Sequence, residues 1–322
     1  MLSRRALLAA PALLAAAPAF AQPAPLAPAV KLTVGQVKVP HVVPFHFVPA
    51  ECAKLGVELE MVNFVRYADV RTALASGSIE VGAIGPADVP IAVSQGLRNI
   101  VGLYGVGASA KNPIVRNGVA LERWEDLIGK RVGIAPGSAV WFQFAATLVE
   151  ANVPYNRLNV VNIQGGGQPF VQAMQRGDID LFIGWEPFES MAITQGVAWR
   201  QTRLDYSKSQ AVGAELGLVG ATRTAIEAKR EALRRFTWAY LKVQAEISAS
   251  KEKLAEAIAA WTGLAPDVAA NVARDMTLGQ FLTLAQMQAQ AKTFHQLGVI
   301  QRDVSAELGE YFDQSIIAAA RA

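Results

Sequence analysis

The chain has 322 residues, of which 30 are Lys or Arg and 27 are Asp or Glu, so its formal net charge is +3. This near balance gives no indication of a nucleic-acid partner or of an anionic membrane surface as a target. The single cysteine, Cys52, cannot form an intramolecular disulfide, so the fold must depend on packing. The length is sufficient for two lobes that each bury a sizeable core.

The first residues are typical of an export signal. Arg4 and Arg5 precede the apolar run 6–17, and an A-x-A motif ends at Ala21. The run is too short for a membrane anchor, which needs about 20 apolar residues. We therefore expect signal-peptide cleavage near Ala21 and a periplasmic protein of 301 residues (322 − 21). Residues 3–8 also resemble a twin-arginine signal, so general and twin-arginine export both stay open.

Strand and helix patterns alternate in the first third of the mature chain. Residues 22–30, rich in Pro and Ala, are expected to form a flexible leader. The expected strands that follow are 31–37, 57–64, 79–84 and 100–106, and the expected helices are 44–55, 67–76 and 87–95. This alternation is typical of a mostly parallel sheet with helices on both faces.

The alternation restarts after residue 118. The expected strands are 131–135, 158–162 and 180–185, and the expected helices are 123–128, 139–151 and 169–176. An apolar strand at 216–221 is expected to return to the first lobe, and the chain is strongly helical from residue 224 onward. We therefore predict an α/β fold of two lobes. Lobe 1 comprises residues 31–118 and 213–322, with the C-terminal helices, and lobe 2 comprises residues 119–212.

A short internal similarity supports two lobes of related construction. Residues 73–81 (ALASGSIEV) align with residues 173–181 (AMQRGDIDL) at a constant offset of 100. Each segment predicts a helix, a glycine cap and a strand. Common helix-to-strand loop chemistry also produces such a match, so the similarity does not prove duplication.

Three strand ends are candidates for ligand contact, because open α/β sheets bind ligands outside the carboxyl ends of their strands. The candidate residues are Gly85, Pro86, Ala87 and Asp88 after strand 79–84, Gly137, Ser138 and Ala139 after strand 131–135, and Glu186 after strand 180–185. The helix N-termini that follow carry unpaired N–H groups and partial positive charge, which favour a carboxylate, sulfonate or nitrate group. Ordinary helix capping remains the alternative at each junction.

Aromatic and acidic side chains accompany these junctions. Tyr67, Trp141 and Trp185 are expected to supply apolar walls for a small-molecule cleft, although each also fits a core position. Asp88 and Glu186 either bind an amine or ring N–H of the ligand or cap the following helices.

The sequence shows no catalytic or metal-binding motif. His41, His46 and His295 lack the spacing and acidic neighbours of a zinc motif, and neither a G-x-S-x-G elbow nor a P-loop is present. We therefore expect no enzymatic activity, no cofactor and no metal.

The chain resembles a known family, the periplasmic binding proteins of the aliphatic-sulfonate, taurine and nitrate type. These proteins are also grouped with thiamine-precursor binders. The resemblance covers nearly all of the mature sequence. Its most specific stretches are residues 73–85 (ALASGSIEVGAIG), 124–138 (WEDLIGKRVGIAPGS) and 174–187 (MQRGDIDLFIGWEP).

The resemblance implies a type II, Venus-flytrap fold that closes on a ligand and delivers it to an ABC permease driven by a separate ATPase. It implies a monomer without membrane insertion. By matching segments, it implies ligand contacts at Gly85, Pro86, Ala87, Gly137, Ser138, Ala139 and Trp185. It also implies a contact at His41 in the loop after the first strand, although the segment there (VPHVVPFHF) departs from the family's usual polar pattern.

Several functions remain open for such a protein. A small organic anion such as an alkanesulfonate is the favoured ligand, and a pyrimidine-like heterocycle or an aromatic carboxylate is the alternative. A ligand-sensing subunit of a membrane signalling receptor is another role. Enzymatic relatives of the thiamine-precursor binders need a cysteine-rich motif, whereas this chain has one cysteine.

Overall fold

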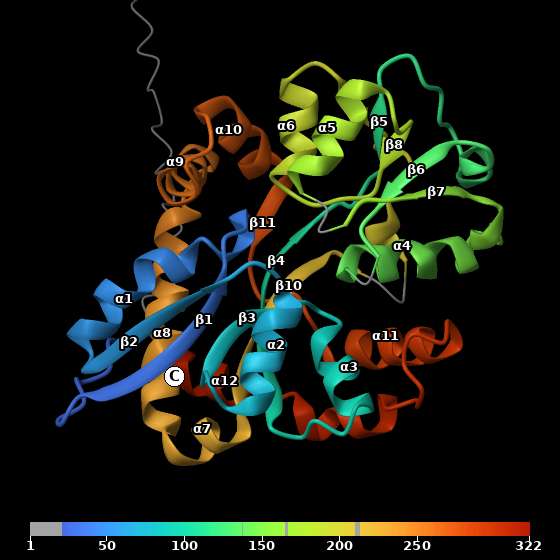
Figure 1. The fold of residues 1–322 in the computed structure, drawn as a ribbon. Coiled ribbons are helices and arrows are strands. Elements are labelled where there is room, and N and C mark those ends of the chain that lie inside the picture. Colours follow the sequence, from blue (N-terminus) through green and yellow to red (C-terminus); the bar gives the residue numbers. More distant parts are fainter. Residues whose placement is uncertain (1–20, 137, 165–166, 210–212) are drawn as a thin grey trace, which may run out of the picture.

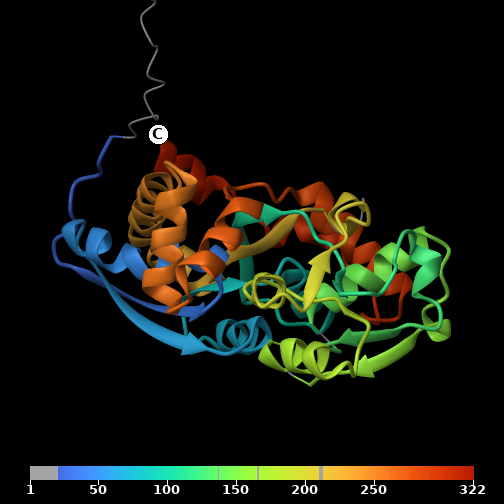
Figure 2. The ribbon, with the colours of Figure 1, turned by 90° about the horizontal axis from the view of Figure 1, so that it is seen from above.

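Two β-sheets organise the computed structural model, which describes residues 21–136, 138–164, 167–209 and 213–322. Residues 1–20 of the expected signal peptide, and Gly137, lie outside the described residues. Each sheet carries helices, and the two sheets form neighbouring lobes (Figure 1). Figure 2 shows the orange C-terminal helices beside the blue N-terminal segments, so both ends of the described chain build the same lobe.

The first sheet has six strands within the described residues, in the order β11-β4-β10-β3-β1-β2. β1 pairs in parallel with β2 and β3, whereas β10 runs antiparallel between β3 and β4. β1 to β4 therefore share one direction, and their carboxyl ends meet at one edge. The bounds are β1 Val30–Val37, β2 Val57–Phe64, β3 Val81–Ile84, β4 Ile100–Ser109, β10 Glu215–Thr222 and β11 Met276–Leu278.

Helices cover both faces of the first sheet because its strands carry apolar side chains on both sides. One core forms beneath α1 (Pro44–Lys54), α8 (Arg230–Ile247), α9 (Lys251–Thr262) and α12 (Ser315–Arg321). The other forms beneath α2 (Tyr67–Ser76), α3 (Asp88–Ser94) and α11 (Leu284–Gln296). The same lobe contains α7 (Arg223–Ala228), α10 (Pro266–Asp275) and the 3-10 turns η1 (Pro40–Val42) and η5 (Ser305–Tyr311).

The second sheet has five described strands in the order β7-β6-β8-β5-β9. β6 is parallel to β7 and β8, and β5 is antiparallel to β8 and β9. Most strands in each sheet thus point one way, but the antiparallel strands make both sheets mixed. The bounds are β5 Ile114–Arg116, β6 Arg131–Ile134, β7 Asn159–Asn162, β8 Leu181–Phe182 and β9 Ala198–Arg200.

Two apolar cores lie on opposite sides of this sheet. α4 (Ala139–Glu150) contributes Phe144 and Leu148 to one of them. α5 (Gln168–Arg176) and α6 (Phe188–Thr194) contribute to the other. The 3-10 turns of this lobe are η2 (Trp124–Leu127), η3 (Tyr155–Arg157) and η4 (Tyr206–Lys208).

β5 lies in the second sheet, although the expected boundary after residue 118 assigned its residues to lobe 1. Sequence patterns did not reveal β5, β9 or β11, because each has three residues and is too short to show a period. The leader is not isolated from the fold either: the Leu26 N–H donates to the Leu55 carbonyl at 2.9 Å, and Arg235 donates to the Ala24 carbonyl at 2.8 Å.

The internal similarity corresponds to equivalent local structure in the two lobes. α2 ends at Gly77 and α5 ends at Gly177, with φ angles of 76° and 74°. In each case the N–H of the following residue returns to the carbonyl of the residue four before the glycine, at 3.0 and 2.9 Å. Glycine tolerates this left-handed conformation, so each helix stops where a buried strand must begin.

The described chain passes between the sheets at residues 110–113 and again within residues 201–214. Hydrogen bonds join the two crossings: Ser109 N donates to Ala214 O at 3.0 Å, and Gln201 N donates to Pro113 O at 3.0 Å. The two lobes are therefore connected by a pair of adjacent segments.

No helix among the described residues combines the length and apolar character needed to cross a membrane.

A first prediction concerns the core between α1 and α8. Phe45 is fully buried and packs edge-on against Phe236 and Tyr240, with ring centroids 5.8 Å apart in both pairs. Phe45→Ala should lower the free energy of unfolding by about 3–5 kcal/mol, measured by urea denaturation. Phe281→Ala is the matched control, because Phe281 is 48% exposed. Equal losses in the two variants would contradict this account of the core.

Candidate functional site

The loops after β1 and β2 bring His41 and Tyr67 together at the carboxyl edge of the first sheet. His41 lies in η1, and Tyr67 is the first residue of α2. The His41 Nε2 and Tyr67 Oη atoms are 2.5 Å apart, a hydrogen bond. These two predicted site residues, 26 positions apart, therefore form one polar group at the edge where ligands of such sheets bind.

Gly85, directly after β3, is the point where the lobes approach each other. A Cβ atom built at Gly85 would lie 3.4 Å from a ring carbon of Tyr67 and 3.6 Å from Cβ of Ala139. Ala139 begins α4 in the second lobe. The predicted residues Gly85, Tyr67 and Ala139 thus meet across the lobes, and a side chain at residue 85 would occupy that space. Pro86 and Ala87 are buried at the same junction.

Asp88 stabilises this junction through hydrogen bonds to Gly85 and Arg71. Its Oδ2 accepts the Gly85 N–H at 2.7 Å, and its Oδ1 accepts from Arg71 at 2.5 Å. Burial raises the pKa of Asp88, and the Arg71 cation and the Gly85 N–H act in the opposite direction. Both carboxyl oxygens therefore have partners within the first lobe.

In the second lobe, Ser138 is the N-cap of α4. Its hydroxyl oxygen accepts the Trp141 N–H at 3.1 Å, as expected for a capping serine. The N–H groups of the first turn have no carbonyl four residues earlier within the helix, so this end remains a donor surface beside Gly85. The predicted contact Gly137 lies outside the described residues.

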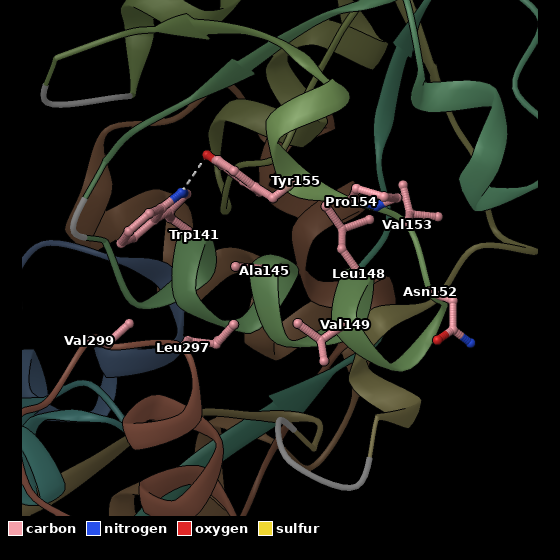
Figure 3. A pocket seen from close by; sticks show the side chains of 10 residues that line it. All are labelled: Trp141, Ala145, Leu148, Val149, Asn152, Val153, Pro154, Tyr155, Leu297 and Val299. Carbon is pink, nitrogen blue, oxygen red and sulfur yellow. Dashed lines mark hydrogen bonds between the residues drawn. The ribbon is translucent and has the colours of Figure 1, made fainter.

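Trp141 points into a cavity on the side of α4. Its indole N–H donates to Tyr155 Oη at 2.7 Å. The cavity has a volume of about 440 Å³, and Figure 3 shows Trp141 and Tyr155 on one side and Leu297 and Val299, from the segment after α11, on the other. Trp141 therefore lines a groove along the flank of α4.

Trp185 and Glu186 follow β8. Trp185 is half-buried and packs edge-on against Phe170 and Phe188, at centroid distances of 5.8 and 6.4 Å. Glu186 accepts hydrogen bonds from the backbone N–H and the hydroxyl of Ser190, at 3.0 and 2.9 Å. Glu186 therefore caps the first turn of α6.

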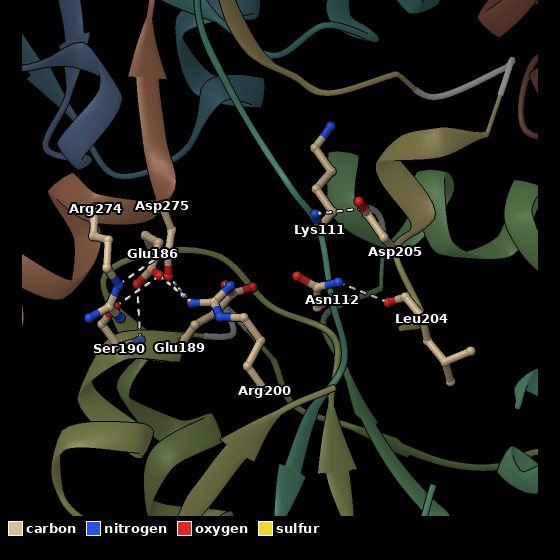
Figure 4. A network of polar contacts seen from close by, with 10 residues as sticks. All are labelled: Lys111, Asn112, Glu186, Glu189, Ser190, Arg200, Leu204, Asp205, Arg274 and Asp275. Carbon is tan, nitrogen blue, oxygen red and sulfur yellow. Dashed lines mark hydrogen bonds and ion pairs between the residues drawn. The ribbon is translucent and has the colours of Figure 1, made fainter. Parts of the chain in front are cut away.

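Arg200, at the end of β9, joins this junction to other acids. Its guanidinium pairs with Glu186 at 2.7 Å and with Glu189 at 2.8 Å (Figure 4). It also lies 3.7 Å from Asp275 at the end of α10. Glu189 is 5% exposed, and burial raises its pKa despite the Arg200 cation.

Comparisons with known proteins agree with this architecture. The sequence profile described as NMT1/THI5 like matches residues 53–252, more than half of the chain. This chain belongs to the NMT1/THI5-like family.

One curated protein is similar in sequence, and solved structures are similar in fold. The taurine-binding periplasmic protein of Escherichia coli (strain K12) is 29% identical over 132 residues, which span 41% of this chain and 40% of the relative. The periplasmic aliphatic sulphonate binding protein SsuA of Escherichia coli superposes with a TM-score of 0.72 and 19% identity, over 87% of this chain and 91% of that one. The periplasmic nitrate-binding protein NrtA of Synechocystis PCC 6803 superposes with a TM-score of 0.74 and 13% identity, over 92% of this chain and 89% of that one. The predicted two-lobed periplasmic-binding-protein fold and the predicted family resemblance are confirmed.

Two buried ionisable side chains, Lys111 and Glu215, lie close to the chain crossings of this NMT1/THI5-like protein. The Lys111 ammonium donates to the carbonyls of Gly213 and Glu215, at 3.0 and 2.7 Å. The Glu215 carboxyl, 1% exposed, accepts the Val106 N–H at 3.1 Å. Burial lowers the pKa of Lys111 to about 7, although Glu215 opposes this, and burial raises the pKa of Glu215 to about 8.

Lys111 lies close enough to His41 to affect its pKa. Burial, assisted by the Lys111 cation, lowers the pKa of His41 to about 3, so the imidazole is neutral at physiological pH. No group of three or more His, Cys, Asp or Glu side chains within the described ranges is arranged to hold a metal ion.

Sequence patterns did not identify Lys111, Arg200 or Glu215. Glu215 does interrupt the apolar stretch that leads into β10, and a lone charge in a buried strand is a usable signal. Lys111 lies between β4 and β5, and Arg200 ends the three-residue strand β9. In such short segments an exposed charge is the common outcome. Nothing local distinguishes them from surface residues.

The buried Glu215 predicts a pH dependence of stability. Between its ordinary pKa of 4.5 and its raised pKa of about 8, the folded protein keeps a proton that the unfolded chain has lost. The free energy of unfolding contributed by Glu215 is therefore complete below about pH 4.5 and declines as the pH rises to about 8. Glu215→Gln should make this decline smaller, measured by urea denaturation at about pH 5 and about pH 8, while the buried Glu189, whose pKa is also raised, keeps its own share. The exposed Glu58→Gln is the control, and a decline as large in Glu215→Gln as in the unaltered protein would contradict the assignment.

Proposed function

We propose that this chain is the periplasmic solute-binding component of an ABC importer, and not an enzyme. It captures a small organic anion, such as an alkanesulfonate, between its lobes and delivers it to a permease with a separate ATPase. It acts as a monomer after removal of a signal peptide near Ala21. The observation that carries the proposal is the close approach of Gly85 and Ala139 from opposite lobes at two strand ends.

The relatives support the proposal by what they bind, since their names specify taurine, aliphatic sulphonates and nitrate. All three ligands carry an anionic group. A binding site of this kind needs few polar groups if they converge on the anion in a closed cleft.

The charges near the strand ends suggest how the anion is held. Arg71 is paired with Asp88, Arg200 with Glu186 and Glu189, and the Lys111 ammonium with two backbone carbonyls. The anionic group is therefore best served by the donor surface at the start of α4, around Ser138 and Ala139. The body of the ligand lies against Tyr67 and Trp185.

A heterocycle or aromatic carboxylate is the second candidate ligand. The cationic side chains near the strand ends already have partners within the protein, which favours a ligand with little net charge. The half-buried Trp185 favours a ligand with a flat ring. His41 and Tyr67 offer a hydrogen-bonding pair to such a ring.

A thermal-shift screen tests the function directly. The mature protein is heated with alkanesulfonates, taurine, nitrate, pyrimidines, aromatic carboxylates or amino acids. A true ligand at about 100 times its dissociation constant adds roughly 2.7 kcal/mol, which raises the Tm by about 5 °C or more. A shift with the sulfonates supports the proposed ligand class, and a shift restricted to pyrimidines or aromatic acids supports the second candidate. No shift with any compound counts against a solute-binding role.

A substitution tests the place of Trp185. Trp185→Ala should weaken the binding of the compound that gives the largest Tm shift, by about fivefold or more, because a ring stacked in a closed cleft contributes on the order of 1–3 kcal/mol. Trp124→Ala is the matched control, since Trp124 is also half-buried in the second lobe but packs against Phe144. Affinity is measured by calorimetry, and an unchanged affinity removes Trp185 from the site.

A further inference from the structure

α10 connects the first lobe to the second away from the two chain crossings. Its buried residues, among them Ala269 and Val272, belong to the core of the first lobe. Its outer side lies beside α6 of the second lobe (Figure 1). There Asn271 donates from its side-chain amide to the Thr194 hydroxyl at 3.0 Å. α10 is therefore an arm of one lobe that contacts the other.

Asp275 ends this arm and faces Arg200. The Arg200 side chain is 13% exposed and the Asp275 side chain is 34% exposed, and their charged atoms are 3.7 Å apart. Arg274 also contacts Asp275, at 3.2 Å, but its side chain is 66% exposed. The partly buried partner of Asp275 is thus Arg200 of the opposite lobe.

Arg200 also holds the turn that carries Trp185. One of its nitrogens donates to Glu186 Oε1 at 2.7 Å, and Glu186 caps α6 through Ser190. The other terminal nitrogen donates to the buried Glu189 on the first turn of α6. One guanidinium therefore contacts the residue after Trp185, the helix that follows and the arm of the other lobe (Figure 4).

We propose that Arg200 is a positioning residue that couples the turn at Trp185 and Glu186 to lobe closure through Asp275. When the lobes close, Asp275 completes the set of carboxylates around Arg200 and restrains the turn. When they separate, Arg200 keeps its two partners in its own lobe, and the turn loses its link to the first lobe. This inference rests on the proposed solute-binding function, because it assigns Trp185 to the ligand.

The size of the effect follows from the exposure of the pair. Ion pairs near the surface change an equilibrium by roughly 1.5-fold to fivefold. Removing the Asp275 charge should therefore shift the ratio of closed to open ligand-free molecules by about that factor. The shift should fall with added salt, because ions screen an incompletely buried pair.

The closure part is tested without any ligand. Spin labels are attached to Glu58→Cys on β2 and Glu125→Cys on η2, which are exposed and lie in different lobes. Cys52 is fully buried and should stay unlabelled. Pulsed electron resonance then gives the distribution of distances between the lobes. Asp275→Asn should enrich the longer distances, and Asp275→Arg should do so more strongly because it places a cation against Arg200.

Asp267→Asn is the matched control, since it removes the same charge from the exposed start of α10. Its distance distribution should equal that of the unaltered protein. Raising the salt from about 0.05 M to about 1 M should shift the unaltered protein toward the Asp275→Asn distribution and leave Asp275→Asn nearly unchanged. Distributions that do not respond to either substitution at Asp275 would overturn the proposal.

The positioning part has its own readout. The tryptophans are replaced with 5-fluorotryptophan, and the fluorine resonance of Trp185 is assigned with Trp185→Phe. Asp275→Asn should move or broaden the Trp185 resonance and leave the Trp124 resonance in place. A Trp185 resonance that does not change would overturn the coupling, even if the lobes open. Because neither measurement requires a ligand, failure here is distinct from failure of the solute screen.

Discussion

The buried ammonium of Lys111 is the contact on which the arrangement of the two lobes depends. It lies on the first crossing and donates to the carbonyl of Gly213 on the second crossing and to that of Glu215, the first residue of β10. The backbone of Lys111 adds a bond from its N–H to Asp205 and a bond from the Tyr206 N–H to its carbonyl. Removing a charge from water is costly unless it is fully paired, so the two crossings must stay side by side for Lys111 to keep its partners. In the proposed solute-binding function, lobe closure would therefore pivot on this pair of joined segments.

Holding the crossings together turns two sheet edges toward each other. The carboxyl end of β3 leads to Gly85, and the carboxyl end of β6 leads to Ser138 and Ala139. The absence of a side chain at Gly85 lets the two junctions approach to ordinary contact distance. In the proposed function, a ligand there would meet groups from both lobes, and it would favour the closed arrangement because only that arrangement offers both sets of contacts.

Local patterns were sufficient for much of the fold. The segment predicted as strand 57–64 and helix 67–76 has these bounds in the structure, because its apolar periods are regular and Gly77 marks the helix end. The three-residue strands were beyond such reasoning, since their pairing partners decide them. The partners of Asp88 and Glu186 were also beyond it: Arg71 and Arg200 are 17 and 14 residues away, and only the fold brings them into contact. The sequence left ligand binding and capping open for both acids, and in each the carboxyl oxygens accept bonds within their own lobe.

These internal pairings have a consequence for selectivity. Arg71, Arg200 and Lys111 all have partners within the protein. In the proposed binding mode, a ligand's charge would therefore meet oriented backbone donors instead of a mobile cationic side chain. Fixed donors need little reorganisation when a ligand binds. The affinity for an anion therefore depends more on its shape and position than on its charge alone. Neutral His41 and the uncharged Tyr67 hydroxyl add directional hydrogen bonds at the opposite wall. Discrimination between a sulfonate and a flat heterocycle then depends on how well each spans the distance from the start of α4 to Tyr67 and Trp185. That distance is set by how far the lobes close.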